Sequence, residues 1–318
     1  MASLMTALVS LLVYQLLKKP IYSLSGKKDQ SPVLNMGLSS FIDDYDEVWK
    51  IKMGDIRTQD WFMMTSPIPT IFIIMGYLAF VHKGLRWMKK REAYDLKRIL
   101  QVYNFCLILV NAYIFYEFFV SAWTNPKVDK FCAPVDKSDD PLSLRLANAV
   151  WWFYFSKIIE LMDTVFFILR KKNTQVTFLH VYHHSTMPAI WWIGVFFAPG
   201  GEAYLCASIN SFIHILMYSY YFLSSLGPHM QKYLWWKKYM TTLQLVQFWW
   251  IMFHTIYAIN LSCGFPNKFN WALVVYDLSH IVLFTNFYYQ TYTKKERRLK
   301  LEQQMLAKVE EIKGNKMN

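Results

Sequence analysis

Long apolar segments recur along most of the chain and alternate with short polar connections. Each segment is close to the ~20 residues that a helix needs to cross the hydrocarbon core of a bilayer. Only helices or closed barrels satisfy their backbone groups inside lipid, and the segment lengths favour helices. The pattern predicts an all-α polytopic membrane protein, a bundle of seven transmembrane helices. These spans cover 66–82, 98–121, 147–169, 177–197, 203–222, 239–260 and 270–292.

Two polar-flanked regions lie outside the predicted bundle. The apolar run from Leu4 to Leu17 is too short to cross a bilayer and has no basic region before it, which favours an interfacial helix over a cleaved signal peptide. We therefore expect an N-terminal luminal or interfacial segment at 1–64, a transmembrane catalytic domain at 65–293 and a charged cytosolic tail at 294–318. Within the fourth span, Pro188 predicts a kink.

The net charge of +12 comes from basic residues in alternate connections and in the tail. Cytosolic loops carry an excess of Lys and Arg, so these connections and the C-terminus are expected to face the cytosol. This placement favours topology signals, lipid headgroups or an anionic substrate as the partners of the basic residues, and no nucleic acid. The cations nearest the histidine-bearing spans are Arg170, Lys171, Lys172, Lys237 and Lys238.

Three histidines, His180, His183 and His184, fall within five residues of the fourth span. On a helix His180 and His184 lie one turn apart on one face, and His183 lies beside them. Ionisable side chains at membrane depth are costly and usually face a bundle interior or a water-filled cavity. The cluster favours metal ligation or acid–base and acyl chemistry over histidines that serve only packing.

Other polar side chains occur in neighbouring spans at a similar depth. At about 1.5 Å per residue, the main groups converge roughly 9–14 Å from the cytosolic face. This convergence predicts a polar chamber that opens to the cytosol; the alternative is a set of hydrogen bonds that only hold the helices together. Besides the three histidines, its candidates are Asn104, Lys157, Glu160, Asp163, Asn210, His214, Gln244 and Gln247.

A metal centre is the main alternative to metal-free chemistry. Membrane di-iron desaturases and hydroxylases also carry a His-x-x-His-His box, but they need several histidine clusters, whereas this chain has one. We expect His254 and His280 to lie deeper in their spans than the cluster. Asp163 with two histidines would still provide a facial triad for one metal ion, so metal-free chemistry is the preferred interpretation, with no metal ligands assigned.

The four cysteines divide between the spans and the connections. Cys106 lies at the depth of the chamber, where a thiol nucleophile is an alternative to histidine. Cys132 and Cys263 lie in connections on the side opposite the cytosol. In an oxidising endoplasmic reticulum lumen they can form a disulfide, although two unrelated thiols fit the sequence equally well.

Four ordered motifs resemble the very-long-chain fatty acid elongases, the membrane 3-ketoacyl-CoA synthases. The similarity extends from about residue 40 to 292, and Tyr182 inside the histidine box resembles the animal members that handle polyunsaturated and very long chains. The motifs are Lys157-Ile-Ile-Glu160-Leu-Met-Asp163-Thr164, His180-Val-Tyr-His183-His184, Asn210-Ser-Phe-Ile-His214-Ile-Leu-Met-Tyr218 and Thr241-Thr-Leu-Gln244-Leu-Val-Gln247.

This resemblance implies that acyl-CoA and malonyl-CoA condense to 3-oxoacyl-CoA, CO2 and CoA in the endoplasmic reticulum membrane. It requires no cofactor beyond the CoA thioesters, and homodimers or other elongation-cycle enzymes are the expected partners besides membrane lipids. His183 is the expected nucleophile, with His214 as its closest catalytic partner.

The resemblance also suggests supporting roles for the remaining candidates. His180 and His184 would orient groups or exchange protons, and Asp163 would hold a histidine tautomer. Lys157 and Glu160 would form a structural ion pair or contact substrate. Hydrogen bonds to substrate are expected from Asn104, Asn210, Tyr218, Gln244 and Gln247, and the cytosolic cations are candidates for binding the CoA phosphates. A seven-helix receptor or transporter, which would bind without turnover, is the third class considered.

Overall fold

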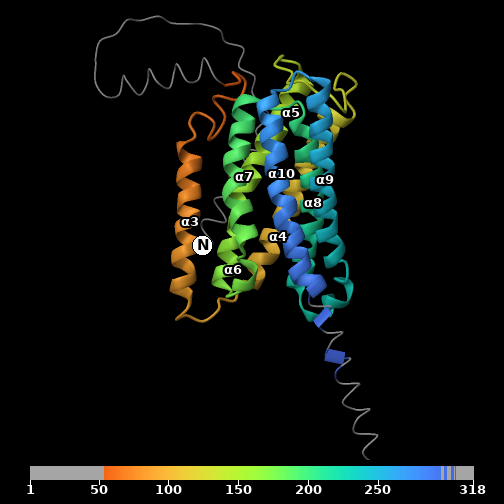
Figure 1. Ribbon diagram of the computed structural model, residues 1–318. Helices are drawn as coiled ribbons and strands as arrows, with labels where there is room; N and C mark the ends of the chain where they lie inside the picture. Colours follow the sequence, from red (N-terminus) through yellow and green to blue (C-terminus); the bar gives the residue numbers. More distant parts are fainter. Residues whose placement is uncertain (1–53, 295–296, 299–301, 304, 306–318) are drawn as a thin grey trace, which may run out of the picture. The chain divides into compact units, whose positions relative to one another are not determined.

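The computed structural model describes residues 54–294 and, in the tail, 297–298, 302–303 and 305. All the regular elements in this part of the chain are helices, which confirms the all-α prediction (Figure 1). The Leu4–Leu17 segment and most of the expected cytosolic tail lie outside the described residues, so the predicted division at 64 and 293 stays a prediction.

The main helices follow the predicted segments closely. They are α3 (Ile68–Met88), α4 (Lys97–Phe118) continued by η1 (Phe119–Trp123), α5 (Pro141–Ile159), α6 (Met162–Leu169), α7 (Phe178–Phe197), α8 (Ala203–Leu226), α9 (Lys237–Leu261) and α10 (Asn267–Tyr288) continued by η4 (Tyr289–Thr293). Short turns, η2 (Asn173–Gln175) and η3 (Pro228–Tyr233), lie in two connections. By length and apolarity, Ile68–Met88 and Lys97–Trp123 qualify as membrane-crossing helices. The full count of seven spans therefore stays a prediction.

The third predicted segment is two helices rather than one. The α5 helix ends at Ile159 and α6 begins at Met162, with Glu160 and Leu161 in a turn between them. In this turn the Leu161 N–H donates to the Ile158 carbonyl at 3.3 Å, a shorter-range bond than an α-helix makes. The break falls within the polar motif, so it determines where Glu160 and Asp163 point.

Capping residues define where α5 and α7 begin. The Asp140 side chain accepts a hydrogen bond from the Leu142 N–H at 3.1 Å, and Pro141 occupies the first helical position. The Thr177 hydroxyl accepts from the His180 N–H at 3.2 Å at the start of α7. The α7 helix then continues through Pro188 to Phe197, so the histidine box occupies its first two turns.

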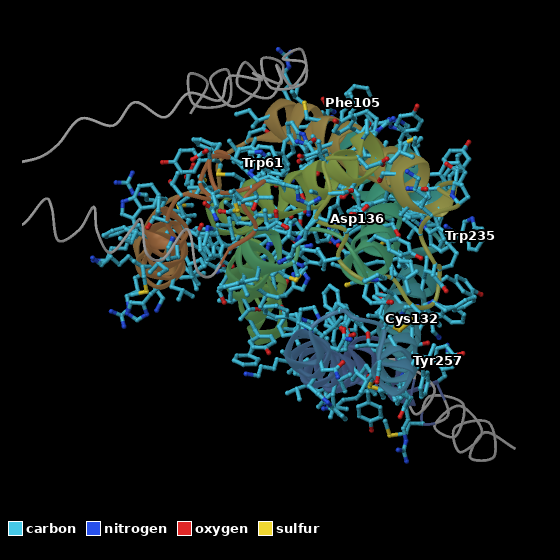
Figure 2. The ribbon with its side chains drawn as sticks, turned by 90° about the horizontal axis from the view of Figure 1, so that it is seen from above. Trp61, Phe105, Cys132, Asp136, Trp235 and Tyr257 are labelled. Atoms are coloured by element: carbon cyan, nitrogen blue, oxygen red, sulfur yellow. A yellow bond between two sulfur atoms is a disulfide. The ribbon has the colours of Figure 1, made fainter. Side chains whose placement is uncertain are left out.

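The helices pack mainly in pairs. The α4 helix lies along α8, α5 along α7 and α9 along α10, while α3 packs against α6 and α7 at the edge of the bundle (Figure 1). Large apolar side chains such as Phe105, Trp235 and Tyr257 are exposed and point outward (Figure 2). Exposed apolar surface of this kind is expected where a bundle faces lipid.

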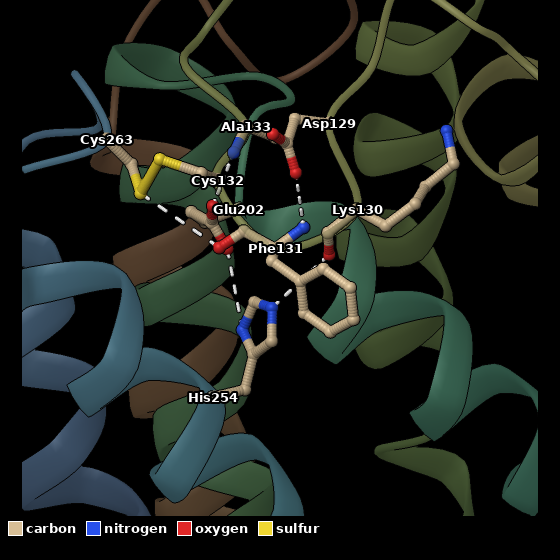
Figure 3. Close-up of a disulfide and its surroundings, with 8 residues drawn as sticks. All are labelled: Asp129, Lys130, Phe131, Cys132, Ala133, Glu202, His254 and Cys263. Atoms are coloured by element: carbon tan, nitrogen blue, oxygen red, sulfur yellow. Dashed lines mark hydrogen bonds and ion pairs between the residues drawn. A yellow bond between two sulfur atoms is a disulfide. The ribbon is translucent and has the colours of Figure 1, made fainter. Parts of the chain in front are cut away.

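The end opposite the basic connections is fastened by a disulfide. Cys132 and Cys263 are joined, which confirms that these thiols pair (Figure 3). Beside the disulfide, Glu202 Oε1 accepts from the Ala133 N–H at 2.5 Å, and His254 Nδ1 lies 3.5 Å from Glu202 Oε2. Burial raises the pKa of the Glu202 carboxyl. These contacts hold the connection before α5 against α8 and α9.

Candidate active site

The centre of the site is a buried cluster of four polar side chains from α5, the α5–α6 turn and α8. Lys157 Nζ lies 3.0 Å from Glu160 Oε1, 3.1 Å from Asn210 Oδ1 and 3.3 Å from His214 Nδ1. His214 Nδ1 also lies 3.1 Å from Glu160 Oε1. None of the four is more than 7% exposed. The ion pair between Lys157 and Glu160 is thus part of the histidine site rather than separate from it.

The cluster selects one tautomer of His214. An ionised carboxylate such as Glu160, paired with the Lys157 ammonium, can only accept hydrogen bonds. His214 Nδ1 lies nearer to this carboxylate, at 3.1 Å, than to Lys157 Nζ, at 3.3 Å, which favours a proton on Nδ1 donated to Glu160. In a neutral ring this leaves a lone pair on Nε2, which is the atom available to accept a proton or to act as a nucleophile.

Asp163 has a different partner from the one expected. Its Oδ2 accepts a hydrogen bond from the Tyr218 hydroxyl at 2.8 Å, and both side chains are buried. Glu160, rather than Asp163, contacts the ring of His214. The turn between α5 and α6 explains the difference, because uniform helical spacing does not hold across it.

The three histidines of α7 lie close to one another, as their spacing predicts. The ring centroids of His180 and His184 are 4.2 Å apart, and those of His183 and His184 are 5.3 Å apart. His180 Nε2 lies 2.8 Å from the Thr164 hydroxyl, which in turn lies 3.0 Å from the Tyr77 hydroxyl. His180 is therefore anchored toward α3 and α6, away from the cluster around Lys157.

A cavity of about 50 Å³ lies beside His183. Asn210, Gln247 and Trp191 also line it, so polar side chains of α8 and α9 reach the same space as the nucleophile candidate. Its other walls are mainly apolar, with Phe153, Met187, Ile190 and Phe248 among them. A small, mainly apolar pocket with a few polar side chains suits the reacting end of a lipid substrate.

Some predicted site residues lie at the edge of this group. Gln244 is half-buried, and its Nε2 approaches Met217 Sδ at 4.0 Å. Asn104 is buried on α4. For both residues, a contact with substrate stays a prediction.

The candidate phosphate-binding cations lie at the ends of helices. Arg170, Lys171 and Lys172 follow α6, and Lys237 and Lys238 begin α9. These helix ends lie at the same end of the bundle (Figure 1). Lys171, Lys172 and Lys237 are exposed, while Lys238 Nζ lies 5.9 Å from the Tyr288 ring centroid.

The prediction that His280 lies deeper than the histidine cluster is wrong. The ring centroids of His280 and His183 are 5.5 Å apart, and both side chains line the same cavity. The expected depth was counted in residues from a predicted span end, and this count misplaced His280. The sequence holds a simpler signal of a functional site here, because His280 and Asp277 are two ionisable residues within one apolar segment.

Within the described ranges, no group of three or more His, Cys, Asp or Glu side chains is arranged to hold a metal ion. Hydrogen-bond contacts of the histidine rings in this part of the chain include those of His180 with Thr164 and of His214 with Glu160 and Lys157.

Residues 62–300 match the GNS1/SUR4 (ELO) family, which is three-quarters of the chain. The chain belongs to this family. It is 47% identical over 275 residues to mouse very long chain fatty acid elongase 4, covering 86% of this chain and 88% of the relative. The human protein of the same name is 46% identical over 265 residues, covering 83% of each chain.

A second kind of elongase is similarly related. Mouse very long chain fatty acid elongase 5 is 46% identical over 241 residues, which cover 76% of this chain and 80% of the relative. The family resemblance seen in the motifs is thus confirmed. A membrane desaturase or hydroxylase, the alternative considered for the histidine box, finds no support in these relationships.

Proposed function

We propose that this ELO-family chain is a very long chain fatty acid elongase that acts through the cluster at Lys157 and the cavity at His183. The reaction is the condensation of an acyl-CoA with malonyl-CoA to 3-oxoacyl-CoA, CO2 and CoA. The observation that carries the proposal is the buried contact of His214 with Glu160 and Lys157 next to the cavity that His183 lines. No metal or organic cofactor is needed for the steps below.

The first step is acyl transfer to His183. A neutral imidazole nitrogen of His183 attacks the thioester carbonyl of the acyl-CoA, forming a C–N bond as the C–S bond breaks. CoA leaves as the thiolate and takes up the proton that the imidazole must lose. Nε2 of His214, which keeps its lone pair, is suited to relay this proton.

The second step forms the new carbon–carbon bond. Malonyl-CoA loses CO2, and the electron pair of the broken bond forms a thioester enolate. The enolate carbon attacks the acyl carbonyl held on His183, and the C–N bond breaks to release 3-oxoacyl-CoA. The departing imidazole nitrogen takes up one proton from water, which restores the neutral ring. Amide N–H groups of Asn210 and Gln247 are the candidates for stabilising the developing oxyanions. Asn210 Oδ1 is occupied by Lys157, which leaves its amide nitrogen for this task.

The remaining proposals concern how the substrate is held. The cations that follow α6 and begin α9 would bind the CoA phosphates at the cytosolic face. On this proposal the protein lies in the endoplasmic reticulum membrane, with a cytosolic C-terminus and its disulfide in the lumen. Tyr182 in the histidine box supports polyunsaturated or very long acyl chains as substrates.

The proposal predicts turnover by purified, chelator-treated protein in detergent. Labelled malonyl-CoA and a long polyunsaturated acyl-CoA should give 3-oxoacyl-CoA by mass spectrometry. His183→Ala should reduce the rate by roughly 10³-fold or more, because it removes the group that carries the acyl chain. The matched control is His254→Ala, a histidine of α9 at the disulfide end of the bundle. A well-folded wild-type protein that makes no 3-oxo product would refute the proposed function.

A further inference from the structure

Two residues of α10 that line the cavity beside His183 each carry a buried polar atom without a hydrogen-bond partner among the described residues. These atoms are Asp277 Oδ2 and His280 Nε2. Asp277 is 3% exposed and His280 is fully buried. A buried polar group without a partner loses its hydrogen bonds to water and gains none in return, which is unfavourable. Both side chains line the cavity, so a group placed there would satisfy the two together.

The hydrogen bonds of His280 define what its free nitrogen can do. Its Nδ1 lies 2.9 Å from the Tyr276 carbonyl, which can only accept, so Nδ1 carries the proton. In the neutral ring Nε2 is therefore a hydrogen-bond acceptor. The Asp277 carboxyl also accepts, and it donates when protonated. Asp277 and His280 together therefore match a ligand group that has both a hydrogen-bond donor and an acceptor.

The pair lies beside the reacting end of the proposed substrate. The rings of His280 and His183 are 5.5 Å apart, and α10 is held to α7 by hydrogen bonds from Tyr276 to Thr186 at 2.7 Å and between Tyr182 and Ser279 at 3.0 Å. Asp277 lies three residues from His280, about 4.5 Å along the helix axis. His280 is therefore next to the histidine that would hold the acyl carbonyl, and Asp277 lies about one turn from His280 on the wall of the same cavity.

We propose that Asp277 and His280 form a polar subsite that accepts a hydroxyl group carried close to the thioester of an acyl-CoA substrate. A hydroxyl donates its proton to His280 Nε2 and accepts a hydrogen bond from Asp277 in its protonated form, which satisfies both atoms. An amino or carboxylate substituent would instead bring a second charge to membrane depth. This subsite rests on the proposed condensing activity. With it, the enzyme would also extend acyl chains that carry a hydroxyl group near the thioester.

The test compares three acyl-CoA substrates of equal chain length with the purified full-length protein. One is unsubstituted, one carries a hydroxyl on carbon 2 and one carries it on the terminal carbon. We expect the wild-type kcat/KM for the 2-hydroxy substrate to stay within about tenfold of that for the unsubstituted one, because a satisfied hydroxyl loses little on burial. Asp277→Leu and His280→Phe should each lower the ratio of these two values by roughly tenfold, as expected for one lost hydrogen bond.

Controls distinguish binding of the hydroxyl group by Asp277 and His280 from a purely structural role of these side chains. The ratio is measured within one sample, so it does not depend on the fraction of folded protein. Asp277→Asn, which keeps a donor and an acceptor, should restore the ratio toward wild type. Asn270→Leu removes another unpartnered buried polar group of α10 that does not line the cavity, and it should leave the ratio unchanged. The terminal hydroxyl should show no dependence on either α10 variant.

Two results would overturn the subsite. One is an equal fall of both kcat/KM values in the α10 variants, which would show that these residues only pack against His183 or hold water. The other is a wild-type enzyme that extends the unsubstituted chain but rejects the 2-hydroxy chain. Failure of the proposed function is a separate outcome, since no 3-oxo product would then form from any of the three substrates.

Discussion

At the scale of single residues, the site depends on one buried negative charge serving two partners. Glu160 pairs with the Lys157 ammonium and accepts from the ring of His214. Buried ion pairs contribute little net stability, but removing one partner leaves the other charge uncompensated. Glu160 therefore matters both for folding and for the protonation pattern of His214.

Replacing Glu160 by Gln tests this dual role. The amide keeps the shape but loses the charge, so we expect a destabilisation of about 3 kcal/mol from the uncompensated lysine. We also expect kcat to fall by roughly 10²-fold, because the amide no longer enforces one tautomer of His214. Thermal melting and condensation kinetics are the measurements.

The matched control is Glu202→Gln, a buried glutamate beside the disulfide. The double variant Lys157→Met with Glu160→Leu should regain stability without regaining activity, since a buried ion pair can be replaced by apolar groups of similar size. Equal activities for Glu160→Gln and Glu202→Gln would contradict the role assigned to Glu160.

Residue identities were easier to predict than residue partners. Spacing alone indicated that His180, His183 and His184 lie together, and their ring distances confirm it. The partner of Asp163 was not predictable, because the turn at Glu160 redirects every side chain after it. His280 was missed because its depth was counted along a helix whose ends the sequence does not define.

At the scale of elements, the start of α5 shows how polar connections fix the helices that carry the site. Asp140 caps α5 and accepts from Lys127 Nζ at 2.8 Å. The hydrogen bond from Lys127 lowers the pKa of the Asp140 carboxyl. A lowered pKa means that the ionised carboxylate stabilises the folded state above the ordinary aspartate pKa, and that this contribution is lost as the pH falls through the folded value.

Asp140→Ala should therefore lower the melting temperature at neutral pH through loss of the cap and of the Lys127 contact. The difference from wild type should shrink as the pH falls below the ordinary aspartate range. Asp140→Asn should show a smaller loss, because asparagine caps helices well. The exposed neighbour Asp139 provides the control variant Asp139→Ala. A melting difference that does not change with pH would contradict the linkage.

Apolar segment length predicted the helices well, because burial of backbone groups in a bilayer leaves few alternatives. It did not predict the break between α5 and α6, since apolar residues continue on both sides of the break. It also did not predict how the helices pair. The pairing of α4 with α8 brings together segments more than 80 residues apart, which no local pattern encodes.

At the scale of the whole molecule, the bundle has two chemically different ends. Basic connections lie at one end, and the disulfide between Cys132 and Cys263 lies at the other (Figure 1). The polar site lies between them, with His183 and His184 in the second turn of α7. This arrangement suits a substrate whose CoA portion stays in water while its acyl chain enters the bundle.

The central claim is that a histidine of α7 carries the acyl chain, and trapping that intermediate tests it most directly. The chelator-treated protein is incubated with a long-chain acyl-CoA without malonyl-CoA and analysed by intact-protein mass spectrometry and peptide mapping. We predict one added acyl group on His183, released by malonyl-CoA as 3-oxoacyl-CoA and absent from His183→Gln. Turnover without any acylated protein, or acylation of Cys106 instead, would contradict the account.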